Sequence, residues 1–297
     1  MKDIRQSENW AKYLSGLGWE FQNINGTLIY LKRIGPSSVT KVQRPQSLSE
    51  GKLKKIEDSA IKNKTLFIKI EPLDSKGEKN LKKAGFERSF FPLLTPSSIF
   101  IDLTKSKEDL WKNLKKDAKY SIRKAQKINL KTDFYVNPNL QTCEKFFKIL
   151  FETGKQKKFY VQPFSDLKTK INSFKDLSIV TLTKKDTEIL SGSLILAFEG
   201  NAFYTHAASS NEGRKFGSSY FELWSTILHL KKKGIKTFDL EGIADERFPS
   251  FTKNWMGFSF FKKKFGGEII KFPPPYIKYY NKILTTLRKL MRAPLPL

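Results

Sequence analysis

The sequence predicts an α+β fold built from two tandem domains, each with a mixed sheet flanked by helices. Two observations favour this fold. Short segments with the apolar pattern of strands alternate with helical segments along all 297 residues. A pattern of strand, acidic strand end, helix, Gly-Phe and aromatic strand also occurs twice, over 65–91 and 237–261, with similar internal spacing. The repeat indicates a duplicated domain.

The first half of the chain begins with a helix and two strands. Apolar spacing predicts helices over 8–17 and 48–63, because apolar residues recur there on one helical face. Short apolar segments predict strands over 19–21, 27–31 and 65–70.

A longer helix is predicted from 106 to 127. Ser106 and Asp109 have the spacing of a capping box, which favours a helix start at this point. Its apolar residues form one stripe: Leu110, Leu114, Ala118, Ile122 and Ala125. Its cations fill the remainder, a pattern typical of a solvated face: Lys112, Lys115, Lys116, Lys119, Arg123 and Lys127.

In the second half, strands and helices alternate again. The predicted elements are helices over 139–157, 218–233 and 277–291, and strands over 177–183, 189–198, 202–208 and 237–240. The turn signal Asn137-Pro138 suggests a domain break nearby. We therefore expect domains over 1–132 and 133–273, with 274–297 returning to complete the first domain through the Pro-rich segment 272–276.

The charge balance indicates polyanionic partners. The chain carries 55 Lys and Arg against 29 Asp and Glu, a net charge of +26 and a pI near 9.9. Such a surface attracts tRNA, nucleotide diphosphates or anionic lipid. Lys dominates the cations, which favours diffuse attraction to phosphates over reading of bases. A Lys-rich genome is an equally good origin of the bias.

Cysteine and histidine are scarce. Cys143 is the single cysteine, which excludes an intramolecular disulfide framework and a Cys-based metal site, and its helical context predicts a small buried side chain. His206 and His229 are too few for a catalytic triad or a metal cluster, so no metal is expected. No segment resembles a signal peptide or a membrane span, which predicts a cytoplasmic protein.

The segment 257–267 is the strongest candidate for chemistry. It packs aromatic and cationic residues before a double glycine that favours a turn, and Lys262 is its candidate catalytic residue. Taken alone, this lysine also fits a solvated turn. Upstream, Asp239 and Glu241 alternate with apolar residues, so a strand places both carboxylates on one face. They would orient a substrate amine or accept its proton, or else pair with a neighbouring lysine.

Several short motifs occur in a fixed order along the chain. They are Gln6-Ser7 with Trp10, Arg33-Ile-Gly-Pro36, Pro96 leading to Ile101-Asp-Leu103, Ile122-Arg-Lys-Ala125, Phe238-Asp-Leu-Glu-Gly-Ile243, and Phe261-Lys262 ahead of Phe265-Gly-Gly267. With the repeat, they resemble the FemABX family of non-ribosomal peptidyltransferases, which transfer amino acids from aminoacyl-tRNA to peptidoglycan precursors. Each half then resembles a Gcn5-related acyltransferase (GNAT) domain. The short stretch between 159 and 177 lacks room for the helical hairpin of larger members and indicates the compact type.

The resemblance implies an aminoacyltransferase without a cofactor, and it assigns the reaction to the Phe-Lys pair. Lys262 would stabilise the oxyanion and protonate the leaving ribose oxygen, and Phe261 would exclude water. It also implies cations around the diphosphate of the precursor, for which Lys32 and Arg33 are the first-domain candidates. In the second domain the expected arginine is replaced by Gln156.

Lys157 or Lys158 could substitute for that arginine, without its bidentate geometry. Tyr204 could contact substrate or could simply be packed. The expected acceptor is a UDP-MurNAc-peptide or a lipid-linked precursor, the expected state is a monomer, and the basic C-terminal helix could touch anionic membrane through cations that include Arg292.

Two other functions fit parts of the sequence. Arg214-x-x-Gly217-x-Ser219 before a helix resembles the pyrophosphate loop that holds acyl-CoA, so an acyl-CoA-dependent GNAT-type N-acyltransferase is one alternative. The same residues also form an ordinary helix cap. A non-catalytic RNA-binding protein, which the charge alone permits, is the other alternative.

Overall fold

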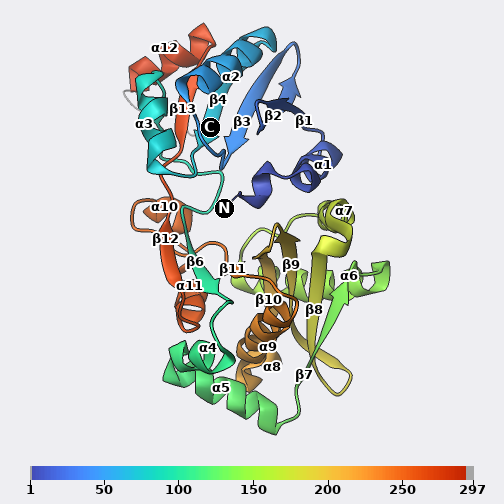
Figure 1. The fold of residues 1–297 in the computed structure, drawn as a ribbon. Coiled ribbons are helices and arrows are strands. Elements are labelled where there is room, and N and C mark those ends of the chain that lie inside the picture. Colours follow the sequence, from blue (N-terminus) through green and yellow to red (C-terminus); the bar gives the residue numbers. More distant parts are fainter. Residues whose placement is uncertain (1, 292–297) are drawn as a thin grey trace. The chain divides into compact units, whose positions relative to one another are not determined.

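The structure is a computed structural model that describes residues 2–291. The chain divides into two compact units, whose elements are labelled in Figure 1. The first unit contains Met1–Ser97, Ala244–Asn254 and Lys271–Leu297, and the second contains Ser98–Ile243 and Trp255–Ile270.

The first unit is built on a six-stranded sheet with the strand order β1-β2-β3-β4-β13-β5. Its strands are β1 (Glu20–Ile24), β2 (Thr27–Ile34), β3 (Ser37–Gln43), β4 (Thr65–Glu71), β5 (Glu87–Arg88) and β13 (Tyr276–Tyr279). β3 and β4 pair in parallel, and the other neighbours pair antiparallel. Its helices are the 3-10 turn η1 (Ile4–Gln6), α1 (Glu8–Gly16), α2 (Glu50–Lys62), α3 (Ser75–Lys83), α10 (Pro249–Thr252) and α12 (Lys282–Met291).

The core of the first unit forms where α2 and α3 cover this sheet. Leu53 and Ile56 of α2 and Leu81 of α3 pack with Ile68 and Ile70 of β4. These side chains are almost fully buried, and burial of apolar area is the main stabilising force of the unit.

The second unit has a seven-stranded sheet with the order β12-β6-β11-β10-β9-β8-β7. Its strands are β6 (Ser97–Asp102), β7 (Lys131–Val136), β8 (Ser178–Lys185), β9 (Glu188–Phe198), β10 (Asn201–Ser209), β11 (Thr237–Asp239) and β12 (Glu268–Lys271). Its helices are α4 (Lys107–Asn113), α5 (Lys116–Lys127), α6 (Leu140–Lys157), α7 (Phe164–Phe174), the 3-10 turn η2 (Lys175–Leu177), α8 (Asn211–Phe216), α9 (Ser218–Lys232) and α11 (Met256–Lys263).

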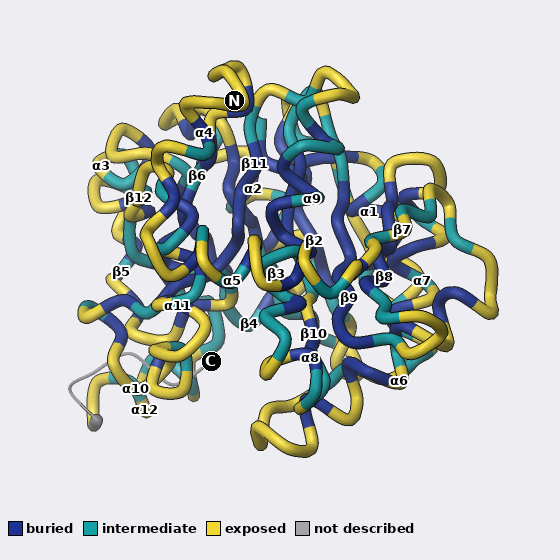
Figure 2. The backbone as a smooth tube through the Cα atoms, turned by 90° about the horizontal axis from the view of Figure 1, so that it is seen from below, coloured by how far each residue is buried: buried dark blue, intermediate teal, exposed yellow. Residues whose placement is uncertain are grey.

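Helices α9 and α6 cover opposite faces of the second sheet. Leu223 and Trp224 of α9 pack in one core cluster with Ile195 of β9, whereas Phe146 of α6 lies over Gly192 of the same strand. Because side chains alternate along a strand, positions 192 and 195 point to opposite faces. Figure 2 shows the strands mostly buried and the outer turns of the helices exposed.

The internal repeat appears in the topology of both sheets. In the first unit β13 lies between β4 and β5, and in the second β6 lies between β11 and β12. A helix precedes the edge strand in each case, and Gly85 and Gly266 each lie two residues before that strand with φ of +78° and +75°. The repeat expected over 65–91 and 237–261 aligns Gly85-Phe86 with Gly257-Phe258 instead and places an aromatic strand up to 261. This alignment is wrong, because residues 256–263 form helix α11.

Several boundaries differ from the predicted elements. The helix expected over 106–127 breaks at Leu114–Lys115, where the Lys115 N–H donates to the carbonyl of Lys264 at 2.9 Å. Its apolar stripe is nevertheless buried throughout. The start of the helix expected over 277–291 is strand β13, and the elements that the prediction missed include β3, β6, β7 and α7.

The compact units do not follow the expected domain boundaries. Residues 98–132 lie in the second unit instead of the first, because β6 pairs with β11 and α5 packs against α9. Residues 244–254 lie in the first unit. No sequence pattern indicates this exchange, because short strands carry no information about their pairing partners.

Candidate active site

Lys262 is a buried cation held by backbone carbonyls. It lies near the end of α11 with only 9% of its surface exposed. Its Nζ donates to the carbonyl of Glu241 at 3.1 Å and to that of Gly242 at 2.9 Å. Its ammonium also lies 4.9 Å from the centre of the Phe258 ring. The lysine therefore does not occupy a solvated turn, and its charge sits at the end of strand β11.

The loop after β11 presents those two carbonyls. Asp239 is buried, and its Oδ1 accepts hydrogen bonds from the Ser98 hydroxyl of β6 and, at 2.7 Å, from the N–H of Glu241. Glu241 has a φ of 57°, in the left-handed region. This turn ends the strand at Asp239, so the alternation expected through Glu241 stops two residues earlier. Asp239 thus braces the turn that holds Lys262.

Burial lowers the pKa of Lys262 from 10.5 to about 8, although the charges of Glu241 and Asp239 act to raise it. The lysine is therefore still mostly protonated at pH 7. A desolvated ammonium acts on a nearby negative charge more strongly than a solvated one, because the local dielectric is low.

Phe261 packs into the aromatic core. Its ring lies 4.8 Å from that of Tyr220 and 5.3 Å from that of Phe265, both in edge-on geometry. These contacts belong to the cluster beneath α9 and fix one side of α11. Packing explains the position of Phe261, and exclusion of water stays a prediction.

Tyr204 lies in the core of the second unit. Its hydroxyl donates to the Glu222 carboxylate at 2.9 Å, and only 4% of the residue is exposed. Glu222 also accepts hydrogen bonds from Thr181, Ser193 and Thr226. Burial raises the pKa of Glu222. The surroundings of Tyr204 favour packing over substrate contact.

The segment resembling a pyrophosphate loop is folded tightly. Gly217 has a φ of +72° and joins α8 to α9, and a Cβ there would lie 3.1 Å from the Cβ of Ser121 on α5. Ser219 lies in the first turn of α9. Because α5 packs against the helix start, a side chain at position 217 would disturb the fold.

Arg214 and Gln156 meet in the structure. The guanidinium donates to the Gln156 amide oxygen at 2.9 Å and also to the backbone carbonyl of Ser209. The neighbouring Lys157 and Lys158 are exposed at the end of α6, where Lys158 takes a φ of 56°. Arg214, Lys157 and Lys158 therefore lie near the end of α6 as a group of cations. The sequence pattern had instead suggested that Arg214 binds the pyrophosphate of acyl-CoA.

Lys32 and Arg33 lie on β2 of the first unit. Lys32 donates to the carbonyl of Leu17 at the end of α1 at 2.7 Å. Arg33 pairs with Glu20 at 3.0 Å and is about half exposed. Both cations make local contacts, and a bound phosphate would accept further hydrogen bonds from these cations or replace their present partners.

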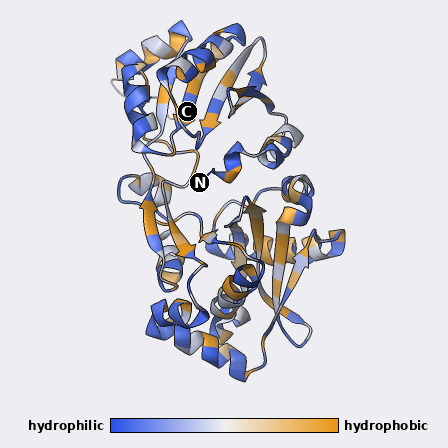
Figure 3. Ribbon diagram, viewed as in Figure 1, coloured by the Kyte–Doolittle hydropathy of each residue, from blue (hydrophilic) through white to orange (hydrophobic). Residues whose placement is uncertain are grey.

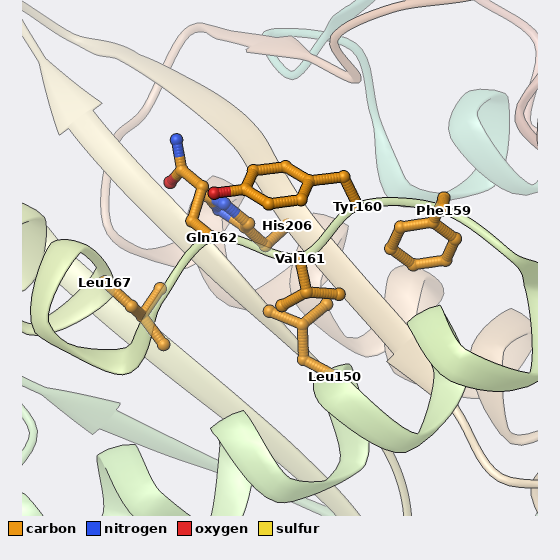
Figure 4. A pocket seen from close by; sticks show the side chains of 7 residues that line it. All are labelled: Leu150, Phe159, Tyr160, Val161, Gln162, Leu167 and His206. Carbon is orange, nitrogen blue, oxygen red and sulfur yellow. The ribbon is translucent and has the colours of Figure 1, made fainter.

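A small cavity of about 60 Å³ lies elsewhere in the second unit (Figure 4). Figure 4 shows Tyr160, Gln162 and His206 along one part of its wall, and Leu150 and Leu167 are among its apolar lining. Burial lowers the pKa of His206 well below its usual value, and the charge of Lys170 adds to this effect. The volume suits about two water molecules, too little for a nucleotide.

Cys143 is buried, as predicted, and burial raises the pKa of its thiol. Within residues 2–291, no group of three or more His, Cys, Asp or Glu is arranged to hold a metal ion. None of the helices in that range is long and apolar enough to cross a membrane. Arg292 lies outside the described residues.

Sequence reasoning missed several parts of the site. The carbonyls of Glu241 and Gly242 have no side-chain signature, and Ser98 comes from a strand more than a hundred residues away. The contact of the Phe258 ring with Lys262 follows from their helical spacing, and the aromatic strand expected up to 261 did not predict this contact.

Two GNAT-like units with a buried lysine at a strand end define a tandem acyltransferase fold. A tandem GNAT protein from the clavulanic acid biosynthesis pathway has this fold, with a TM-score of 0.51 and 9% identity over 85% of this chain and 78% of that one. The crystal structure of FemX is more similar, with a TM-score of 0.80 and 16% identity over 97% and 94% of the two chains. The C-terminal domain of a putative lysylphosphatidylglycerol synthetase from Agrobacterium fabrum follows, with a TM-score of 0.67 and 15% identity over 97% and 92%.

The sequence model of the FemAB family matches residues 155–292. This range includes Lys262 and the two carbonyl groups that bind its ammonium, those of Glu241 and Gly242, here called the carbonyl cradle. The resemblance expected from the sequence is thus confirmed, and the chain is an enzyme of the transferase class. A search of curated proteins gave no match.

Proposed function

We propose that this protein is an aminoacyltransferase that extends the stem peptide of a peptidoglycan precursor, with aminoacyl-tRNA as the donor. The buried Lys262 in its carbonyl cradle is the observation that carries the proposal. The FemAB family match over the same segment supports the acceptor class. No cofactor is needed, because the ester of the donor is already activated.

The reaction joins an amine to an ester carbonyl. The amine nitrogen of the acceptor attacks the carbonyl carbon and forms a tetrahedral intermediate with a negative oxygen. The C–O ester bond then breaks, the ribose oxygen leaves with a proton, and the nitrogen loses one. Both oxygens carry developing negative charge, so a single fixed cation next to them accelerates formation and collapse of the intermediate.

Lys262 supplies that cation. The Glu241 and Gly242 carbonyls take two of its three hydrogens, and the third would point to the substrate oxygen. Asp239 is a positioning residue in this scheme, because its hydrogen bonds fix the turn that carries the Glu241 carbonyl. The Glu241 carboxylate would orient the attacking amine.

The precursor diphosphate would bind to exposed cations. Lys32 and Arg33 in the first unit and Lys157 and Lys158 in the second are the candidates, and each is a Lys or Arg at or near the surface. Arg214 is a further candidate, because it adds the one guanidinium that this edge of α6 otherwise lacks.

Helix α12 supports peripheral contact with an anionic membrane. Ile283, Leu287 and Leu290 recur at helical spacing and are 70%, 43% and 75% exposed. Lys282 and Lys289 flank this apolar stripe. A short amphipathic helix of this kind lies in the bilayer interface. We expect a cytoplasmic monomer that meets the inner face of the membrane.

The acyl-CoA alternative has less support. The start of α9 that would hold a pyrophosphate is packed against Ser121 of α5 at Gly217. The RNA-binding alternative leaves the burial of Lys262 unexplained, because an ammonium that only contacts phosphates gains nothing from desolvation.

The test is a transfer assay with a labelled amino acid and a UDP-MurNAc-peptide acceptor. The wild-type protein should transfer from charged tRNA and not from acyl-CoA. Lys253→Met controls for the loss of a lysine charge in general: it removes an exposed lysine and should retain full activity. Transfer from acyl-CoA alone, or none from charged tRNA, would contradict the proposal.

A further inference from the structure

Helix α12 exposes a stripe of aliphatic side chains. Ile283, Leu287 and Leu290 are 70%, 43% and 75% exposed, and their helical spacing places them on one side of the helix. Figure 3 shows hydrophobic residues interrupted by hydrophilic ones along α12. Single exposed leucines are common on protein surfaces, whereas three aligned on a helix of 10 residues form a patch that a partner covers.

The start of α12 adjoins the end of α2. The N–H of Asn281 donates to the carbonyl of Leu66 at 3.2 Å, and the Tyr280 hydroxyl donates to the Glu57 carboxylate of α2. Ile61 lies one helical turn after Glu57 and is 60% exposed. Figure 1 shows both helices at the same end of the first unit. Their exposed aliphatic residues are here called the α2–α12 face: Ile61, Ile283, Leu287 and Leu290.

Lysines flank the α2–α12 face. Lys282 and Lys289 lie on α12 next to the stripe, and Lys62 is the last residue of α2. All three are exposed, and none of them forms an ion pair with any part of the chain that the structure describes. Their charges are therefore available to a negatively charged partner.

The carboxylates near this face add little negative charge. Glu57 pairs with Lys278, and Glu87 pairs with Arg288 at 2.7 Å. Asp58 of α2 is exposed, and the three flanking lysines outweigh it. The face thus matches a partner that is negative at its surface and apolar beneath.

An anionic lipid bilayer has both properties. Aliphatic side chains of an amphipathic helix insert at the boundary of the acyl chains, and lysines beside them bind the headgroup phosphates. A second copy of the chain fits less well. A symmetric contact places the same patch on both sides, so Lys282 and Lys289 would meet their own copies and repel them.

We infer that the α2–α12 face docks on an anionic bilayer, and that the anionic fraction of this bilayer regulates the access of the enzyme to an acceptor anchored there. Docking confines the protein to the surface and raises its effective concentration beside such an acceptor. The regulation rests on the proposed function for the identity of the acceptor, and the docking does not. Anionic lipid should therefore change KM and not the chemical step.

The first test measures insertion. The full chain is mixed with vesicles of phosphatidylcholine and phosphatidylglycerol, and the fraction that sediments with them gives the partition coefficient. Ile283→Gln with Leu290→Gln should lower this coefficient on the order of tenfold or more, because two side chains no longer insert. Ile61→Gln should lower it by a smaller factor. Leu140→Gln with Leu177→Gln is the matched control, since these leucines of the second unit are 50% and 38% exposed, and it should have no effect.

The second test measures the charges. Lys282→Gln with Lys289→Gln should weaken binding to the anionic vesicles about fivefold for each lysine. It should leave binding to pure phosphatidylcholine vesicles unchanged, because these carry no net charge. Lys145→Gln with Lys148→Gln, at exposed positions of α6, changes the net charge equally and should preserve binding to both.

The third test measures regulation. Transfer is followed with an acceptor peptide anchored in the same vesicles. A larger fraction of phosphatidylglycerol should lower the apparent KM of the wild type and leave kcat unchanged. Ile283→Gln with Leu290→Gln should lose this dependence on lipid and keep wild-type transfer to the soluble UDP-MurNAc-peptide.

Three outcomes would overturn the inference. The first is a wild type that does not sediment with anionic vesicles, or variants of the face that sediment as the wild type does. The second is a dimer that Ile283→Gln with Leu290→Gln separates while vesicle binding persists, which would show an interface between copies. The third is a KM that does not respond to lipid charge.

Failure of the proposed function gives a different result. The wild type would then dock on the vesicles, the variants of the face would lose docking, and neither acceptor would be extended. If transfer to the soluble acceptor proceeds while the wild type does not bind vesicles, only the inference fails.

Discussion

Helices α3 and α11 occupy matching places in the two halves of the repeat, yet they bury opposite kinds of residue. Each is followed by a glycine with positive φ and an edge strand, and Gly85 and Gly266 donate to the carbonyls of Lys82 and Lys263, three residues earlier. Aligned on these glycines, Leu81 of α3 matches Lys262 of α11. Leu81 is fully buried in an apolar core, and Lys262 is buried on two carbonyls. The scaffold is shared, and the buried charge is what distinguishes the second copy.

The two strand-end acids differ in the same way. Glu71 accepts the N–H groups of Leu93 and Leu94 at 2.8 and 3.1 Å and so fixes a loop. Glu241 presents its backbone carbonyl to Lys262 instead. Duplication therefore supplied the fold, and a local change of the turn after the strand created a place for a desolvated cation.

A buried ammonium introduced at position 81, the first-copy counterpart of Lys262, should have the largest effect on stability. Leu81→Lys puts an ammonium where Leu81 is fully buried among apolar side chains. The free energy of unfolding should fall by about 3–5 kcal/mol. Leu81→Met is the matched control and should cost less than about 1.5 kcal/mol. Chemical denaturation measures both, and a small loss for Leu81→Lys would show that the carbonyl cradle is not what permits burial at 262.

The reverse exchange should abolish most of the activity. Lys262→Leu installs the residue that the first copy already accommodates, so the fold should be retained. The transfer rate should drop about 10²–10³-fold at saturating substrate, because a charge that acts mainly on the transition state is lost. Transfer kinetics check kcat and KM separately. An unchanged kcat with a raised KM would assign Lys262 to substrate binding.

Stability should also depend on pH through Lys262. Its pKa is about 8 in the folded protein, below the ordinary 10.5, so the unfolded chain binds more protons between these values. The wild type should therefore gain stability relative to Lys262→Leu as pH rises from about 8 to 10.5, by about 3 kcal/mol, and the full penalty should persist below pH 8. Denaturation curves of both proteins across this range measure the difference. Parallel pH profiles would mean that Lys262 is not desolvated.

Sequence patterns predicted the α+β class and most helices, because these depend on local periodicity, and a motif singled out Lys262, whose catalytic role stays a prediction. They did not predict that β6 and β13 enter the sheets between strands distant in sequence, since a short strand does not encode its partner. They also predicted an aromatic strand ending at 261, where the structure has helix α11. In this helix Ser259 and Lys262 are buried instead of the aromatic residues, so the spacing of apolar residues did not predict a helix.

The smallest expected effect concerns the hydrogen bond from Ser98 to Asp239, which supports the turn that carries the Glu241 carbonyl. Ser98→Ala removes the hydroxyl that donates to Asp239, which should loosen the turn at Glu241 and lower transfer about tenfold. Ser97→Ala is its matched control, because the Ser97 hydroxyl donates to the buried Asp245 in the first unit. Both should lose similar stability, about 1–3 kcal/mol, and only Ser98→Ala should shift the pH profile of transfer. Equal losses of transfer in the two variants would reduce Ser98 to a structural residue and leave the cradle without a specific support from β6.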